Sequence, residues 1–319
     1  MTGRTTSAPT VLFHFADDEG LRARLDPLLR GMDVIWCAAE DDAGLQRALP
    51  RIDVWWHVLQ PISAQHIEQA SRLRLIQKLG TGVDTIDVGA AERRGVLVSN
   101  MPGLNAPAVV EMTLALLLAV VRQIVPLHAR TLRGEGWPLD PSLAGRVPEV
   151  AGSTVGLIGS GDIAGRLTPV LLGLGARVIH TSRTRRDDPN WCDLETLLRT
   201  SDIVSVHVPL DRDTRHLIDA RAMATMRRGA ILINTSRGGV IDQVALADAL
   251  GSGQLAGAGL DVVEPEPISG ADPLLRAPNL VVTPHVAWLS GPTLSRCVAL
   301  AADNVRRLLA GHEIRNRVV

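Results

Sequence analysis

The segment from Thr154 to Thr184 constrains the fold of this chain more than any other, because it joins an apolar strand pattern to a glycine-rich turn. Residues Thr154 to Ile158 predict a buried strand that leads into Gly159-Ser160-Gly161. A helical pattern follows, and its apolar face is formed by Ile163, Leu167, Val170, Leu171 and Leu174. Gly175 ends this helix, and Arg177 to His180 predict a second strand. The segment is therefore a βαβ unit of about thirty residues, the context in which such glycines indicate dinucleotide binding.

The glycines of this turn have separate roles in binding a dinucleotide. Gly159 permits the tight turn, and Gly161 lets the backbone approach a pyrophosphate. Ala164 stands at the third position of the motif, where close helix–strand packing requires only a small residue. The helix N-terminus adds unpaired N–H groups and a positive dipole end. The alternative interpretation is a glycine turn that binds nothing.

The end of the second strand indicates which cofactor is used. In NAD-binding units an acid about twenty residues after the glycines binds the adenosine ribose, and this chain has no acid near Ser182. Instead the strand runs into Ser182-Arg183-Thr184-Arg185-Arg186. Guanidinium groups pair with phosphate, whereas an acid would repel it, so the sequence predicts a preference for NADP(H) over NAD(H). The alternative is that these arginines form only a solvated loop.

Composition bounds the class of protein. The 319 residues and the apolar content of 46% predict a large core divided between two domains. The net charge of −1, without a basic run interleaved with aromatic residues, argues against a nucleic-acid partner. The apolar run Leu114 to Val121 is too short to span a bilayer, and Met1 to Thr10 resembles a frayed polar tail. Cys37, Cys192 and Cys297 are scattered, so we expect no disulfide or metal site and a reducing cytoplasm.

Strand and helix patterns alternate along the whole chain, which predicts parallel sheets covered by helices on both faces. Before the glycine turn, the expected helices are residues 19–29, a segment from residue 63, and 87–94, and the expected strands are 11–15, 34–36, 54–57, 75–79 and 96–99. After it, the expected helices are 193–200, 220–227 and 243–251, and the expected strands are 203–208, 231–234, 258–261 and 280–283. Residues 134–150 are expected to be a looser connection, and the amphipathic tail 293–310 to return to the first domain.

A strongly apolar helix is predicted from Asn105, with Pro107 in its first turn. Because it is apolar on nearly every side, either the rest of the molecule or a second subunit must cover it. We expect a homodimer.

Three predicted strands end in reactive side chains. Arg237 follows one strand, Glu264 and Glu266 follow the next, and His285 follows the last. Reduction of a 2-oxo acid needs a proton donor for the new alkoxide, which suits histidine, and a carboxylate beside it stabilises imidazolium. A guanidinium can hold the substrate carboxylate and polarise the carbonyl. The rival imidazole, His207, ends an inner strand and is expected on the adenosine side.

A second glycine loop, Gly80-Thr81-Gly82-Val83-Asp84, follows a predicted strand in the first half of the chain. Its free backbone N–H groups predict an anion site, and a tight turn without a ligand is the alternative. Lys78, the only lysine, lies just before this loop as either a substrate-binding or an ordinary structural residue.

Taken together, these motifs resemble the D-isomer-specific 2-hydroxyacid dehydrogenase family over nearly the whole chain. The resemblance implies two α/β domains with doubly wound parallel sheets. One is a Rossmann NAD(P)-binding domain (residues 101–285), and the other is a flavodoxin-like substrate domain (residues 1–100 and 286–319). It also implies that Arg237, Glu266 and His285 are the catalytic residues, which selects Glu266 over Glu264.

The resemblance further distributes the binding roles. Backbone amides at Thr81 and Gly82 would hold the substrate carboxylate, and Trp288 resembles a pocket-wall aromatic of glyoxylate and hydroxypyruvate reductases. The substrate-binding residues are expected to be Lys78, Gly80, Thr81, Gly82, Asn105, Arg237, His285 and Trp288. The cofactor-binding residues are expected to be Gly159, Gly161, Asp162, Ile163, Ser182, Arg183, Thr184, His207, Val208, Pro209, Thr214, Thr235, Arg237, Asp261 and His285.

The leading hypothesis is thus an NADP(H)-linked reductase of small 2-oxo acids that yields the D-hydroxy acid. A cofactor-sensing protein, like the corepressors that share this fold, is an alternative from another class. Within the same fold, a formate or phosphite dehydrogenase is a third interpretation.

Overall fold

The computed structural model describes residues 8–137, 141, 148–185 and 187–319. The chain divides into two compact units. Unit 1 comprises residues 1–105 and 289–319, and unit 2 comprises residues 106–288. The division expected from the sequence, at 100/101 and 285/286, falls close to these limits.

Unit 1 is built on a five-stranded parallel sheet with the order β2-β1-β3-β4-β5. Its strands are β1 (Thr10–Phe15), β2 (Asp33–Ala38), β3 (Val54–His57), β4 (Leu75–Lys78) and β5 (Leu97–Ser99). This is the flavodoxin-like order, in which the chain direction across the sheet reverses between the first and third strands. The β3 and β4 strands are buried throughout because helices cover both faces.

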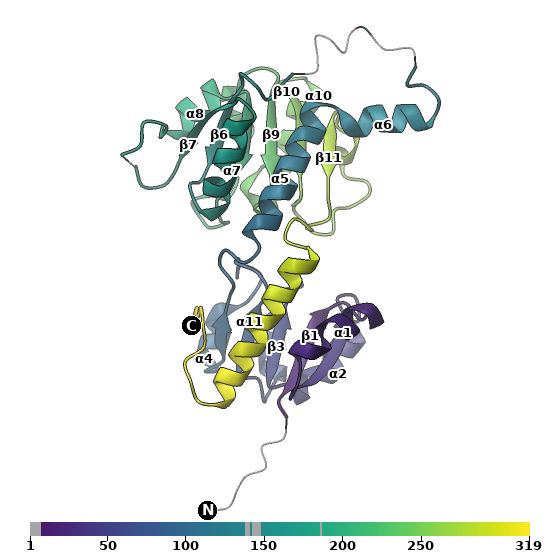
Figure 1. Cartoon of the computed structure of the whole chain (residues 1–319), viewed down its shortest axis with the longest axis vertical. Helices are drawn as coiled ribbons and strands as arrows, with labels where there is room; N and C mark the ends of the chain where they lie inside the picture. Colours follow the sequence, from purple (N-terminus) through teal and green to yellow (C-terminus); the bar gives the residue numbers. More distant parts are fainter. Residues whose placement is uncertain (1–7, 138–140, 142–147, 186) are drawn as a thin grey trace, which may run out of the picture. The chain divides into compact units, whose positions relative to one another are not determined.

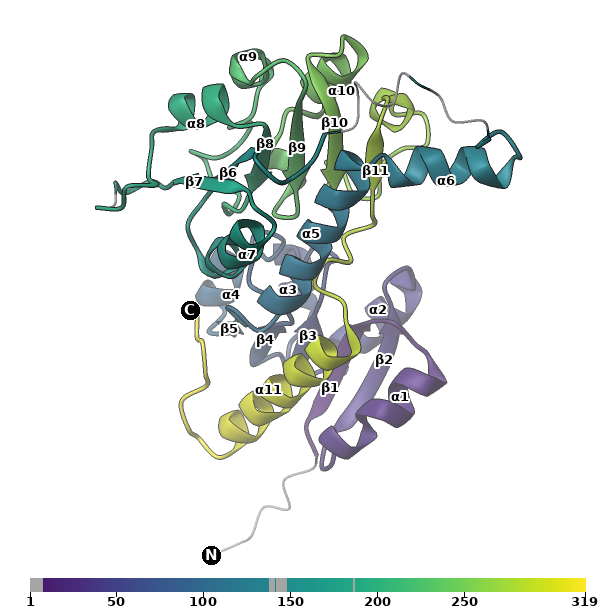
Figure 2. The same cartoon turned by 45° about the horizontal axis from the view of Figure 1, so that its top comes forward.

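Helices form a layer on each face of the unit 1 sheet (Figures 1 and 2). One core cluster packs the sheet against α2 (Asp42–Ala48), α3 (Ala64–Gln69) and α4 (Val88–Arg93). On the other face lie α1 (Glu19–Leu25) and the amphipathic α11 (Gly291–Leu309). The α11 helix is anchored by Asn304, whose Nδ2 donates to Gln77 Oε1 at 2.7 Å and to Ser99 Oγ at 3.2 Å.

Unit 2 is built on a six-stranded parallel sheet with the order β11-β10-β9-β8-β6-β7. Its strands are β6 (Thr154–Ile158), β7 (Arg177–Thr181), β8 (Ile203–Val206), β9 (Ala230–Asn234), β10 (Leu255–Leu260) and β11 (Leu280–Val282). The strand order reverses between β6 and β8, and ligands of such sheets bind beyond the strand ends at this point.

Two helical layers also cover the unit 2 sheet (Figures 1 and 2). One core cluster joins it to α5 (Ala106–Val121) and α7 (Asp162–Gly173). The other joins it to α8 (Leu194–Thr200), α9 (Ala220–Thr225) and α10 (Gln243–Gly251). The two parallel sheets with alternating helices confirm the predicted α/β class.

Several helices differ from the sequence-based expectations. The α2 helix and α6 (Ile124–Leu132) were not predicted, and 138–140 and 142–147 of the expected loose connection lie outside the described residues. In α7, Val170 and Leu174 are exposed although the predicted apolar face included them; Leu167 and Leu171 form the buried stripe. The α5 helix packs on β9, β10 and α7, so its own unit covers much of it, while Val110, Leu114 and Leu118 remain half-buried.

Candidate active site

The turn after β6 has the geometry that a dinucleotide-binding turn requires. Gly159 has a φ of +105°, and a Cβ there would lie 2.7 Å from the carbonyl oxygen of His207. Only glycine is compatible with both restrictions. The turn is held on both sides by the flanking strands, since Gly159 N donates to Thr181 O at 2.9 Å and His207 N donates to Ile158 O at 2.7 Å.

The N-terminus of α7 differs from those of most other helices because no side chain caps it. Asp or Ser side chains accept hydrogen bonds at the starts of α1, α2, α3, α4, α8, α9, α10 and α11. The residue in the capping position before α7 is Gly161, which provides no such acceptor and has open space where a Cβ would be. The first-turn N–H groups, including those near Asp162 and Ile163, are therefore available to an anion. These residues fit the pyrophosphate of a nicotinamide cofactor.

Arg183, which follows β7, forms an ion pair with Asp211, a residue that the sequence analysis did not identify. Ser182 Oγ donates to Thr184 O at 2.7 Å, and Arg183 Nη2 lies 2.6 Å from Asp211 Oδ2. Asp211 belongs to the loop after β8, beside the predicted Val208, Pro209 and Thr214. Arg185 stacks over Trp191, and Arg186 lies outside the described residues.

His285 and Glu266 form a hydrogen-bonded pair in unit 2. His285 Nδ1 lies 2.7 Å from Glu266 Oε2, and their side chains are 19% and 34% exposed. Because a carboxylate only accepts, Nδ1 is the donor and Nε2 is left for a substrate. Glu264, the other candidate acid, forms a bidentate pair with Arg215 at 2.9 and 3.0 Å. The geometry therefore separates the two glutamates that residue types alone left open.

Asp261 holds the turn that presents His285. Its carboxylate accepts from Thr283 Oγ1 at 2.6 Å and from the N–H groups of Val286 and Ala287 at 3.0 and 2.7 Å. His285 has a φ of +54°, a conformation that a non-glycine residue holds only with support from its surroundings. Burial raises the pKa of Asp261, and the Thr283 hydrogen bond opposes this shift. These contacts give Asp261 a role in supporting the histidine turn, and its expected role in binding the cofactor stays a prediction.

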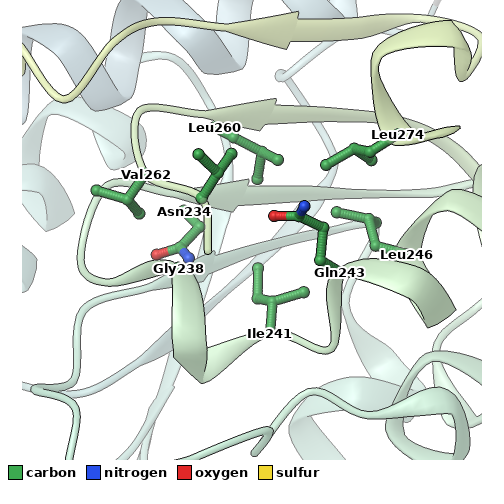
Figure 3. Close-up of a pocket in the computed structure, with 9 residues that line it drawn as sticks. Asn234, Gly238, Ile241, Gln243, Leu246, Leu260, Val262 and Leu274 are labelled. Atoms are coloured by element: carbon green, nitrogen blue, oxygen red, sulfur yellow. The ribbon is translucent and has the colours of Figure 1, made fainter. Parts of the chain in front are cut away.

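Arg237 lies in a turn fixed by the end of β9. Asn234 Nδ2 donates to Arg237 O at 2.8 Å, and Arg237 Nη1 donates to Ser236 O at 2.8 Å. At Gly238 a Cβ would lie 2.1 Å from the backbone of Val263, so a glycine allows the loops after β9 and β10 to touch. Figure 3 shows the mostly apolar pocket beside this turn, which Asn234 and Gln243 line with polar side chains.

Two predicted cofactor residues have other hydrogen-bonding partners. Thr235 is buried, and its Oγ1 lies 2.8 Å from Thr113 Oγ1 on α5. His207 Nε2 lies 2.9 Å from Ser205 Oγ, and burial lowers the pKa of His207 to about 4. A histidine with this pKa is neutral near pH 7 and is a poor proton donor, so His207 is a weaker candidate than His285 for the acid.

In unit 1, the glycine loop follows the end of β4. Met101 N donates to Gly80 O at 2.8 Å, and Asn100 Nδ2 donates to Thr81 O at 2.8 Å. Lys78 is 5% exposed, donates to Val58 O, and passes against Gly80, where a Cβ would lie 3.3 Å from Lys78 Cε. This placement links the ends of β3 and β4 beneath the loop, where Gly82 is half-buried.

The structure brings Arg237, Glu266 and His285 to the ends of the adjacent strands β9, β10 and β11. Trp288 is buried in the same unit, and its Nε1 donates to His285 O at 3.1 Å. Lys78, the glycine loop and Asn105 belong to unit 1.

Comparison with known proteins identifies the family. Residues 114–287 match the family described as "D-isomer specific 2-hydroxyacid dehydrogenase, NAD binding domain". The chain belongs to the D-isomer-specific 2-hydroxyacid dehydrogenase family. This dehydrogenase is thus an oxidoreductase that uses a nicotinamide cofactor and a small-molecule substrate.

Individual relatives agree with this assignment. The dehydrogenase is 39% identical to a glyoxylate reductase of Korarchaeum cryptofilum over 77% of its own length and 76% of the relative's. It is 38% identical to a hydroxypyruvate reductase of Thermotoga maritima over 76% of its own length and 80% of the relative's. Among solved structures, the TT0316 protein of Thermus thermophilus superposes with a TM-score of 0.88 and 35% identity, covering 97% of this chain and 100% of that one.

Two features are absent from the part of the chain that the structure describes. Within this part, no group of three or more His, Cys, Asp or Glu side chains could hold a metal ion. No single helix there is long and apolar enough to cross a membrane. Only α5 and α6 taken together are long and apolar enough, and that pair is bent by 64°.

Proposed function

We propose that this dehydrogenase is an NADP(H)-preferring reductase of small 2-oxo acids, such as glyoxylate or hydroxypyruvate, that forms the D-2-hydroxy acid. The observation that carries the proposal is the hydrogen bond of 2.7 Å between His285 and Glu266. His285 follows β11 and Glu266 follows β10, and these two strands are neighbours in the sheet. An imidazole oriented by a carboxylate is suited to donate a proton to an oxygen that becomes an alkoxide.

A nicotinamide cofactor, held by the glycine turn after β6 and the N-terminus of α7, would supply the hydride. Arg237 binds the substrate carboxylate and polarises the carbonyl through its guanidinium. As the carbonyl carbon accepts the hydride, His285 donates the proton from Nε2 to the carbonyl oxygen, and the product is a neutral hydroxyl. Glu266 accepts from Nδ1 throughout, fixes the ring orientation and stabilises the imidazolium form before transfer. In the oxidative direction the same imidazole accepts the proton.

Arg183 supports the NADP(H) preference. It stands after β7, where NAD-binding units carry an acid, and its side chain is 70% exposed and can reach a 2′-phosphate. Ser182, turned onto the Thr184 carbonyl, adds no negative charge there.

The proposed function is tested by measuring kcat/KM for glyoxylate, hydroxypyruvate and phenylpyruvate with NADPH and NADH. We expect steady turnover with at least one acid, a D-configured product where the product is chiral, and a higher kcat/KM with NADPH. A clear NADH preference would contradict the cofactor assignment. Cofactor binding without turnover on a broad panel would favour a sensor, and turnover of formate or phosphite would favour the third interpretation.

We also propose a homodimer, located in the cytoplasm, that uses α6. This helix projects from the rest of unit 2 (Figure 1) and exposes Ile124, Val125 and Leu132. Trp137, just beyond it, is 80% exposed. Apolar residues gathered in this way on a surface commonly mark a protein interface.

Light scattering tests the dimer. Leu132→Glu places a charge on this apolar surface, and we expect the mass to fall from twice the single chain to the 34.1 kDa of one chain. Ala224→Glu adds the same charge on the exposed side of α9 and should leave the mass unchanged. A wild-type mass of one chain would exclude the dimer.

A further inference from the structure

An ion pair links the two loops that flank the glycine turn of unit 2. Arg183 follows β7 and Asp211 follows β8, and these two strands lie on either side of β6. Arg183 Nη2 and Asp211 Oδ2 are 2.6 Å apart. The pair therefore lies at the end of the sheet where the strand order reverses, the place at which such sheets bind nucleotides.

Asp211 is fixed by its own loop as well as by Arg183. Its Oδ1 accepts from the N–H groups of Asp213 and Thr214 at 2.9 and 3.0 Å. Thr214 Oγ1 in turn donates to Pro209 O at 2.7 Å. The hydrogen bond from Arg183 and those from the loop lower the pKa of Asp211, so the carboxylate carries its charge at neutral pH. The carboxylate is therefore anchored by its own loop independently of Arg183.

The end of the site where the adenosine ribose is expected thus contains both a carboxylate, from Asp211, and a guanidinium, from Arg183. NAD-binding units place the acid at the end of the second strand, and here an acid reaches the region from the following loop instead. A 2′-phosphate approaching Arg183 also approaches Asp211, which repels it and already balances the guanidinium charge. A free ribose hydroxyl, by contrast, can donate to Asp211 Oδ2.

We infer that Asp211 is a specificity-determining residue that limits the preference for NADP(H) and keeps NAD(H) usable. This inference rests on the proposed function, because it takes Arg183 as the group that binds the 2′-phosphate. Arg183 and Asp211 are 70% and 37% exposed, and an ion pair this exposed contributes little to stability. A doubly charged 2′-phosphate can therefore compete with Asp211 for Arg183. The negative charge of Asp211 still repels the phosphate and weakens its binding.

The opposite role is that Asp211 aims Arg183 at the phosphate. The two roles predict opposite changes in the affinity for a 2′-phosphate when the charge of Asp211 is removed. Removing the carboxylate charge strengthens binding of a 2′-phosphate if Asp211 repels it, and weakens binding if Asp211 only positions Arg183. The exposure of the Arg183 guanidinium and the independent anchoring of Asp211 favour repulsion.

The test uses the full-length enzyme and ligands that carry only the adenosine end of each cofactor. The Kd values of adenosine 2′,5′-bisphosphate and of AMP are measured by calorimetry for wild type and Asp211→Asn. Asparagine keeps the Oδ1 acceptor for the loop. We expect the bisphosphate to bind roughly tenfold tighter to the variant, AMP to bind no tighter, and the gain to shrink at high salt.

Matched variants make the result specific. Asp213→Asn removes an equal charge two residues away, outside the Arg183 pair, and should change the bisphosphate Kd much less. Asp211→Thr, which also offers an oxygen to the loop, should repeat the gain if the asparagine variant is unstable. An unchanged or weaker bisphosphate Kd in the folded variants would overturn the inference. The wild-type ratio of NADPH to NADH efficiency tests the proposed function separately, because it is measured on the unaltered enzyme, whereas the inference rests on the change in Kd that Asp211→Asn causes.

Discussion

Replacing His285 with alanine is expected to lower kcat for 2-oxo acid reduction by about 100-fold or more, with little change in the Kd of NADPH. The imidazole is the proton donor in the proposed mechanism, and its Nδ1 is already committed to Glu266. Loss of the ring removes the donor at the carbonyl oxygen but leaves the glycine turn and the Arg183 region intact. Steady-state kinetics and fluorescence titration with NADPH measure the two quantities.

A matched imidazole variant separates a chemical effect from a general loss of structure. His207→Asn removes the rival ring, whose pKa of about 4 makes it a poor donor near neutral pH. We expect this variant to retain most of kcat. Equal losses in both variants, or near-normal turnover in His285→Ala, would show that the acid has been assigned to the wrong side chain.

The second large effect is expected at Arg237. Arg237→Ala should lower kcat/KM by about 10²- to 10³-fold through both a higher KM and a lower kcat, because one guanidinium binds the carboxylate and polarises the carbonyl. Arg237→Lys keeps the charge but loses the planar fork, so we expect it to recover only part of this loss.

The same kinetics on Arg215→Ala provide the control for Arg237. Arg215 is bound to Glu264, and the carboxylate of Glu264 is separate from the His285 pair. This variant should stay within a few-fold of wild type. If Arg237→Ala changes KM alone, the guanidinium only binds substrate, and its proposed part in polarising the carbonyl is wrong.

Much of the fold could be predicted because buried parallel strands are short apolar runs between turn signals. All of the strands that the structure describes correspond to predicted ones, within a few residues at their ends. The short helices were harder to predict from the sequence. The α2 helix has seven residues and includes Gly44, and α6 carries Pro126 in its first turn, so neither repeats its apolar positions long enough to be recognised.

The catalytic candidates could be found because the ends of parallel strands gather at one edge of a sheet. That rule selects Arg237 and His285 without a structure. It could not separate Glu264 from Glu266, since both follow the same strand, and the choice depends on which one the turn directs toward His285.

Asp211 was missed for a related reason. It lies in a loop beyond β8, and its importance comes from the arrangement of β7 and β8 around β6, which brings Arg183 to it. Likewise, Asp261 follows a strand as a ligand-binding acid would, but its carboxylate is occupied by the backbone of the histidine turn. Residue type and position gave no sign of either pairing.

The central claim is that His285 delivers its proton to the same carbonyl group that receives the hydride. A crystal structure of the enzyme with NADP⁺ and an unreactive 2-oxo acid analogue such as oxamate tests it most directly. We expect His285 Nε2 to lie within about 3 Å of the analogue's carbonyl oxygen, with the nicotinamide C4 facing the carbonyl carbon. A complex in which His285 points away from the bound analogue, with another group hydrogen-bonded to that oxygen, would contradict it.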